Sequence, residues 1–345
     1  YGHISNRQAT CQALRAVAHS MRITTLLAVA AASVAAVSLD DSATSSSAVQ
    51  AEVQADASLG LALLTRRSSV LSRASETAEI PLTLLFNHKR NLMKLSDEDL
   101  ASDQQTSLLR QNVRHTIDSF RGAGEPKVFF WDNAECAQGL RSLEQFGGSE
   151  LAKDFESEPA GMVKSDLCRL AMLYLYGGYY FDTDILPVVP MYDHLGKDTT
   201  FATVVATDGD NLFQAFMAAS PRHPLIAEAL RTFRSWYRGD LQSGTAGGNV
   251  GTVLLKQAFT DWSGEAVANR VVHRHGHVSR FFTEGKIDSL KQKFSGLLQG
   301  SSEGLCNYAV VDGSTQTLLM YSRVYDSRAH VACKEEAQLL GTLGK

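Results

Sequence analysis

The chain has 345 residues, a length that suits one large α/β domain or two smaller ones, and its 44% hydrophobic content is ample for a buried core. The formal net charge is −4, and the lysines and arginines form no cluster beyond short pairs such as Arg66-Arg67. This balance argues against a nucleic-acid partner.

The first 79 residues differ in composition from the rest of the chain. A weakly apolar, alanine-rich run from Ile23 to Leu39 follows Met21-Arg22. We expect residues 1–39 to be an N-terminal extension plus a cleaved signal peptide or a type II signal anchor; a buried alanine-rich helix is the alternative. Residues 40–79 are rich in Ser, Ala and Thr and predict a stem or linker. A signal or anchor predicts the secretory pathway.

Residues 80–335 are expected to form one folded domain, with a tail at 336–345. Its first elements can be placed from apolar patterning and turn residues. Ile80–Phe86 predicts a short strand and Asp103–Arg121 a polar helix.

The most informative stretch comes next. Apolar residues spaced by three and four predict a helix from Met162 to Tyr176, which Gly177-Gly178 ends. The aromatic residues Tyr179–Phe181 predict a short strand. Because side chains alternate along an extended chain, we expect Asp182 and Asp184 to point to one face.

This stretch concentrates negative charge in apolar surroundings. Asp166 and Arg169 are neighbours on the predicted helix, and Asp182 and Asp184 follow it closely. At about 5 Å and an effective dielectric of about 20, two like charges repel by roughly 3 kcal/mol. One arginine cannot neutralise three aspartates, so the sequence predicts a divalent cation. A hard cation prefers carboxylate oxygen and keeps positions open for phosphate.

The composite pattern is Ser165-Asp166, Arg169, an apolar helix, Gly177-Gly178, Tyr180, Asp182 and Asp184. It resembles the DXD-containing sugar transferases of glycosyltransferase family 32, which include fungal Golgi mannosyltransferases and animal α-1,4-galactosyl- and N-acetylglucosaminyltransferases. The glucosylating domain of large clostridial toxins shares the arrangement. A bare DXD is a weak signal, whereas the composite over about two dozen residues is specific.

The resemblance implies a GT-A-type fold, a nucleotide-sugar-binding α/β/α sandwich in a single catalytic domain. It implies that Asp184 binds Mn²⁺ or Mg²⁺, which holds the donor diphosphate. Asp182 would hold ribose and sugar hydroxyls and assist at the metal. Asp166 and Arg169 would grip the transferred sugar.

Further candidates come from the same resemblance. The family's first strand ends at the nucleotide, so the stretch from Phe86 to His88 is a candidate base contact. The run Lys127–Asp132 resembles the family's second strand, which ends in Trp-Asp. Tyr180 is either a donor contact or a core residue of its strand. Near the end of the chain, Asp326 and His330 are candidates for the rest of the metal shell.

The implied function is a metal-dependent retaining glycosyltransferase. It would move a hexose from a UDP- or GDP-linked sugar to a glycan, glycolipid or protein acceptor, in the Golgi lumen or membrane or as a secreted enzyme. The family's Thr-Gly-Pro is missing at Thr245–Thr252, and its usual Ser-Trp ending is absent. These departures leave open the alternative, a catalytically inactive sugar-nucleotide-binding or scaffold protein of the same fold, although the intact DXD argues against it.

Cysteines and histidines leave two further questions. Four cysteines lie beyond the N-terminal region: Cys136, Cys168, Cys306 and Cys333. We favour a Cys306–Cys333 disulfide because Cys168 lies on the buried helix; four free thiols are the alternative. Three alternating histidines at 273, 275 and 277 would share one face of a strand, but no cysteine or carboxylate stands at ligand spacing, so no zinc site is predicted.

Overall fold

The computed structural model describes residues 79–207, 211–241, 249–268, 270–293 and 308–322. All of them belong to residues 74–345, one of the two units into which the chain divides. The expected leader, nearly all of the stem, and the tail lie outside the described residues, as do Cys306, Cys333, Asp326 and His330. Within the described part, no helix combines the length and apolarity needed to cross a bilayer.

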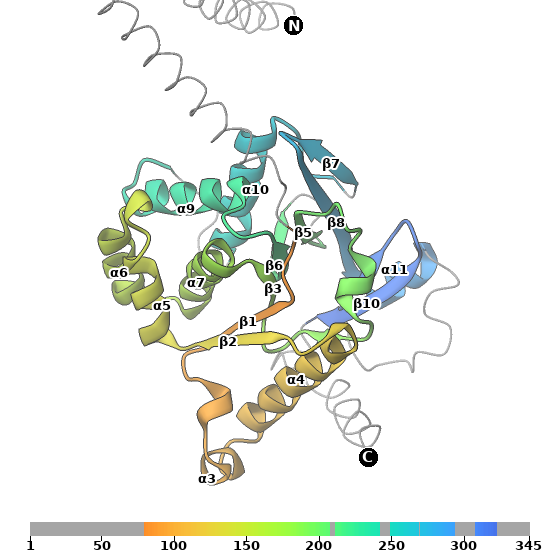
Figure 1. Cartoon of the computed structure of the whole chain (residues 1–345), viewed down its shortest axis with the longest axis horizontal. Helices are drawn as coiled ribbons and strands as arrows, with labels where there is room; N and C mark the ends of the chain where they lie inside the picture. The colour runs from red at the N-terminus through yellow and green to blue at the C-terminus, as the bar shows by residue number, and fades with distance from the viewer. Residues whose placement is uncertain (1–78, 208–210, 242–248, 269, 294–307, 323–345) are drawn as a thin grey trace, which may run out of the picture. The chain divides into compact units, whose positions relative to one another are not determined.

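The described residues form a mixed sheet of ten strands with helices around it (Figure 1). The strand order is β2-β1-β3-β6-β5-β8-β9-β10-β4, and β7 pairs with β8. The strands are β1 (Thr83–Asn87), β2 (Lys127–Trp131), β3 (Gly178–Phe181), β4 (Leu186–Pro187), β5 (Phe201–Val205), β6 (Leu212–Ala219), β7 (Val271–Arg274), β8 (His277–Lys286), β9 (Tyr308–Asp312) and β10 (Thr317–Ser322).

The α-helices lie between these strands in the chain. They are α3 (Asp97–Ala101), α4 (Gln104–Phe120), α5 (Asn133–Arg141), α6 (Gly148–Ser157), α7 (Gly161–Tyr176), α8 (Met191–His194), α9 (Pro224–Tyr237), α10 (Val250–Ser263) and α11 (Ile287–Lys293). The helices predicted at 103–121 and 162–176 are therefore confirmed, and β2 lies within the run Lys127–Asp132 that resembles the family's second strand.

The sheet separates two apolar layers. Leu85 and Tyr180 face a cluster built with α5, α6, α7, α9 and α10. Leu84 and Phe181 face the opposite cluster, built with α4 and α8. Because successive side chains of a strand point to opposite faces, short strands buried on both sides have apolar centres, as Leu84–Phe86 of β1 and Tyr179–Phe181 of β3 show. The predicted α/β class with helices on both faces is confirmed.

The strands that lead to the charged residues are parallel. β1 pairs in parallel with both β2 and β3, so their carboxyl ends meet at one edge of the sheet. In a sheet of this kind, ligands bind beyond the carboxyl ends of the strands. The fold thus brings Asn87, Asp132 and Asp182 to the same edge.

Candidate functional site

A cavity of about 870 Å³ lies at this edge. It is lined by the residues that follow β1, by one face of α7, by the turn after β3, by β6 and by the first turn of α10. Its size is that of a site for a small molecule or cofactor. Asp166, Arg169, Asp182 and Asp184, the four principal candidates from the sequence, all line it.

The two DXD aspartates do not stand on a strand. β3 ends at Phe181, and the chain turns immediately, with the amide of Ile185 donating to Asp182 O at 3.1 Å. The expectation that strand alternation would place both acids on one face was therefore wrong, because a turn has no two-residue period. The turn nevertheless directs both side chains to the same cavity.

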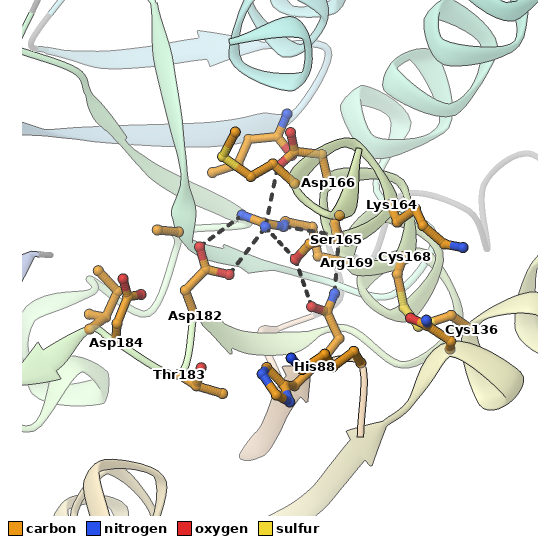
Figure 2. Close-up of a pocket in the computed structure, with 18 of the residues that line it drawn as sticks. His88, Cys136, Lys164, Ser165, Asp166, Cys168, Arg169, Asp182, Thr183 and Asp184 are labelled. Carbon is orange, nitrogen blue, oxygen red and sulfur yellow. Dashed lines mark hydrogen bonds and ion pairs between the residues drawn. A yellow bond between two sulfur atoms is a disulfide. The ribbon is translucent and has the colours of Figure 1, made fainter. Parts of the chain in front are cut away.

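Arg169 is the centre of the charged cluster (Figure 2). Its Nη2 lies 3.2 Å from Asp166 Oδ1 and 3.1 Å from Asp182 Oδ1. Arg169 and Asp166 are buried, at 4% and 7% exposed. An isolated charge at this depth is costly, and the pairing of the two offsets that cost. One cation thus serves two carboxylates.

Neighbouring groups fix the guanidinium in place. Arg169 Nη2 donates to Ser165 Oγ at 2.6 Å and Nε donates to Ser165 O at 3.2 Å. The guanidinium also stacks over the ring of Tyr180, 4.7 Å from its centroid. These contacts use the planar fork of arginine, which the point charge of a lysine would not reproduce.

Burial and charge shift the protonation equilibria of this cluster. Burial raises the pKa of Asp166 to about 7, Arg169 opposes the rise and Asp182 adds to it. Burial works against the charge of Arg169, but the neighbouring Asp182, Tyr180 and Asp166 raise the pKa of Arg169 overall. Burial also holds the pKa of Tyr180 well above its usual range, so its hydroxyl is a neutral donor.

The arrangement suits a divalent cation bound together with a ligand. Among the described residues, no group of three or more histidine, cysteine or acidic side chains could hold a metal by itself. Magnesium-type sites, however, often use one or two carboxylates and complete their shell with phosphate oxygen and water. In Figure 2, Asp182 turns toward Arg169, whereas Asp184 lies apart from that cluster. Asp184, which lines the cavity and is partly exposed, fits such a role.

The remaining candidates are placed differently. Phe86 is fully buried and stacks on Phe130 with ring centroids 5.9 Å apart, so it does not line the cavity. Tyr180 is also fully buried, and its hydroxyl donates to Asp182 Oδ1 at 2.5 Å. Tyr180 therefore affects the cavity through its hydrogen bond to Asp182. Its ring is part of the core, the second of the two roles considered for it.

Several cavity residues were not singled out from the sequence, apart from Asn87, which lies in the stretch from Phe86 to His88 that was expected near the base. Asn87 ends β1, Gln214 lies on β6, and Asn249 and Thr252 flank the start of α10. Gln214 is 2% exposed; its Nε2 donates to Gly251 O, and its Oε1 has no hydrogen-bond partner in the described part of the structure. Polar residues at the ends of strands were the available signal, but a single sequence does not show which strand ends meet.

A disulfide closes one wall of the cavity. Cys136 on α5 is bonded to Cys168 on α7, with Cα atoms 5.3 Å apart, and both residues line the cavity. The inference that Cys168 would be left unpaired because it is buried was wrong, because α5 packs against the same face of α7 and presents Cys136 there. The favoured Cys306–Cys333 pair lies outside the described residues.

Comparisons with known proteins agree with the motif. Residues 99–202 match the family described as glycosyltransferase sugar-binding region containing DXD motif. This segment includes α7 and the DXD turn. This segment of the chain is thus similar to the sugar-binding region of the DXD glycosyltransferases, and the resemblance seen in the sequence is confirmed.

Individual relatives match over short segments. The human alpha-1,4-N-acetylglucosaminyltransferase is 27% identical over 100 residues, which are 29% of this chain and 26% of that protein. Inositol phosphoceramide mannosyltransferase 1 of Schizosaccharomyces pombe is 36% identical over 76 residues, 22% of this chain and 23% of that protein. The match therefore spans about a quarter of each relative's length. Among solved structures, the PaToxG glycosyltransferase aligns with a TM-score of 0.30 and 14% identity, over 58% of this chain and 79% of that one.

Proposed function

We propose that this protein is a metal-dependent, retaining glycosyltransferase that moves a hexose from a nucleotide sugar to a carbohydrate, glycolipid or glycoprotein acceptor. The single observation that carries this function is the meeting of the Asp166–Arg169 pair with Asp182 and Asp184 in one cavity of about 870 Å³. The four residues that the sequence motif singles out are thus also grouped in the folded chain.

The residues of the cavity divide into two groups by charge balance. Arg169 already balances much of the charge of Asp166 and Asp182, so this group suits the hydroxyls of a sugar. Asp184, with help from Asp182, would hold Mn²⁺ or Mg²⁺ against the donor diphosphate. A cation held there supplies Lewis-acid stabilisation of the departing diphosphate.

The donor nucleotide and the acceptor are narrower proposals. The two relatives are named as an N-acetylglucosaminyltransferase and a mannosyltransferase, so UDP- and GDP-linked sugars are both donors to test. The Cys136–Cys168 disulfide and the signal-like run at 23–39 together support the secretory pathway, since disulfides persist in oxidising compartments. A Golgi enzyme is the corresponding proposal.

The decisive experiment is a panel of UDP- and GDP-sugars incubated with the full chain in Mn²⁺, Mg²⁺ or EDTA. We expect metal-dependent release of the nucleoside diphosphate from one donor class, and a product with the anomeric configuration of the donor, read by NMR. Asp184→Asn should abolish release without unfolding the protein. Asp118→Asn, which changes an exposed acid on α4, is the matched control.

The outcomes separate the two candidate functions. Tight binding of a nucleotide sugar without any turnover would identify the inactive sugar-nucleotide-binding protein. Metal-independent turnover, or normal turnover in Asp184→Asn, would contradict the metal-dependent mechanism.

A further inference from the structure

Asn87, the last residue of β1, connects the two elements that carry the charged residues. It is 6% exposed and lines the cavity. Its Nδ2 donates to Ser165 O at 3.0 Å, and its Oδ1 accepts hydrogen bonds from Ser165 Oγ at 2.7 Å and from the Tyr180 hydroxyl at 3.2 Å. One side-chain amide thus joins α7 to β3.

On the α7 side, these bonds determine how Ser165 meets Arg169. A serine hydroxyl has one hydrogen, and Ser165 donates it to Asn87. The lone pairs of Ser165 Oγ are therefore available to Arg169 Nη2, which donates to it at 2.6 Å. Without Asn87, the hydroxyl would be free to rotate, and the guanidinium would lose an acceptor of fixed orientation.

On the β3 side, Asn87 lies beside the donor that holds Asp182. The Tyr180 hydroxyl donates to Asp182 Oδ1 at 2.5 Å and, in a longer bifurcated contact, to Asn87 Oδ1. Asp182 Oδ1 is also the atom that lies 3.1 Å from Arg169 Nη2. The two arms of the network, through Ser165 and through Tyr180, therefore close on the same ion pair.

We propose that Asn87 is a positioning residue for sugar transfer: through Ser165 and Tyr180 it fixes Arg169 and Asp182 relative to each other. This inference rests on the proposed function. Positioning matters because a misplacement of about 1 Å at reacting groups costs on the order of 100-fold in rate. The role differs from a ligand contact, since its effect would fall on turnover and not on nucleotide affinity.

The test compares Asn87→Ala with Asn91→Ala. Asn91 precedes the short 3-10 helix η2 (Leu92–Lys94), is 9% exposed, donates to Phe130 O at 2.9 Å and does not line the cavity. It is thus a buried asparagine of the same segment with a purely structural bond. We expect kcat of Asn87→Ala to fall about 100-fold per folded molecule, while Asn91→Ala retains it.

Two further readouts separate positioning from other roles. The Kd of UDP or GDP with Mn²⁺ should stay within about twofold in Asn87→Ala, and adding Ser165→Ala to it should cause little further loss, because both changes remove one network. Unchanged kcat, a loss of nucleotide affinity in place of kcat, or fully additive losses would each overturn the proposal. If Asn87→Ala does not fold, Asn87→Leu, which keeps the approximate shape and removes both the Nδ2 donor and the Oδ1 acceptor, takes its place with the same expectations.

A measurement without turnover keeps this inference distinct from the proposed function. NMR can follow solvent exchange of the Arg169 Nε–H, which donates to Ser165 O at 3.2 Å. We expect exchange at least about tenfold faster in Asn87→Ala than in the wild type and in Asn91→Ala. Equal exchange rates would overturn the positioning role, whereas a wild type that turns over no donor would overturn only the glycosyltransferase function.

Discussion

The backbone of Gly251, in the first turn of α10, lies directly against the carboxylate of Asp166 on α7. A Cβ built on Gly251 would stand 2.0 Å from Asp166 Oδ2 and 2.3 Å from its Cγ. Asp166 is thereby held between the α10 backbone on one side and Arg169, 3.2 Å away, on the other. The close approach of α10 to Asp166 therefore leaves no room for a side chain at position 251.

Gly251→Ala should therefore displace Asp166. We expect the unfolding free energy to fall by about 1–3 kcal/mol from overpacking, and turnover to fall by up to about 100-fold because the Asp166–Arg169 pair moves. Urea unfolding and donor hydrolysis measure the two effects. Gly161→Ala, at which no atom lies within 4 Å of the new Cβ, is the stability control. Unchanged stability and turnover in Gly251→Ala would contradict the close contact.

The raised pKa of Asp166 predicts a pH dependence of stability in the absence of metal and donor. The folded protein holds the Asp166 proton up to about pH 7, against an ordinary pKa of 3.8. The folded state therefore binds more protons in this window, so the contribution of Asp166 to the unfolding free energy decreases as pH rises from about 4 to about 7. Asp166→Asn removes a slope of at most about 1.4 kcal/mol per pH unit. Denaturant unfolding across this window tests it; an unchanged slope would contradict the raised pKa.

The buried His223 should give stability a pH dependence opposite in sign to that of Asp166. It is 1% exposed; its Nδ1 accepts from the amide of Leu225 at 3.2 Å, and its ring lies 4.6 Å from that of His277. Burial, then the neighbouring His277, holds the pKa of His223 well below 6.5. The unfolded state therefore binds more protons below about pH 6.5, and the stability present above this pH is lost as pH falls.

His223→Gln should lower stability near pH 7.5, because it removes the helix cap of α9, and should flatten the acid side of the curve. His277→Gln should flatten it in part, since it removes the neighbouring ring. Thermal unfolding between about pH 5 and 8 is the measurement. If stability fell as steeply with decreasing pH in both variants as in the wild type, other groups would be responsible for the loss.

The Cys136–Cys168 disulfide should stabilise the fold and the shape of the cavity. The two cysteines are separated by 32 residues, a loop for which the entropic estimate is about 3–4 kcal/mol. Cys136→Ser with Cys168→Ser should lower the unfolding free energy by up to this amount. A dithiol reductant should destabilise the wild type and leave the double variant unaffected. If the reductant destabilised both proteins equally, its effect would not come from reduction of the Cys136–Cys168 disulfide.

Some features were determined by local sequence. The spacing of apolar residues between Met162 and Tyr176 predicted α7, and Gly177, with φ of 62°, ends it. The run Lys127–Asp132 indicated β2, which ends one residue earlier, at Trp131. Asp166, Arg169, Asp182 and Asp184 could be named as site residues because they lie within two dozen positions of one another.

Other features depend on residues distant in the sequence. The histidines at 273 and 277 lie on the two strands of a hairpin, with His275 and Gly276 at positive φ between them, so they are not three positions of one strand. Cys136 lies within bonding distance of Cys168 only because α5 packs on α7.

The sequence by itself determined which charged residues of α7 and of the turn after β3 belong to the site, because helix and strand periods act over a few residues. Only the tertiary structure decided that Asn87 from β1, Gln214 from β6 and Gly251 from α10 meet them. Those contacts arise from strand order and helix packing, which depend on the summed burial of the whole domain and not on any local pattern.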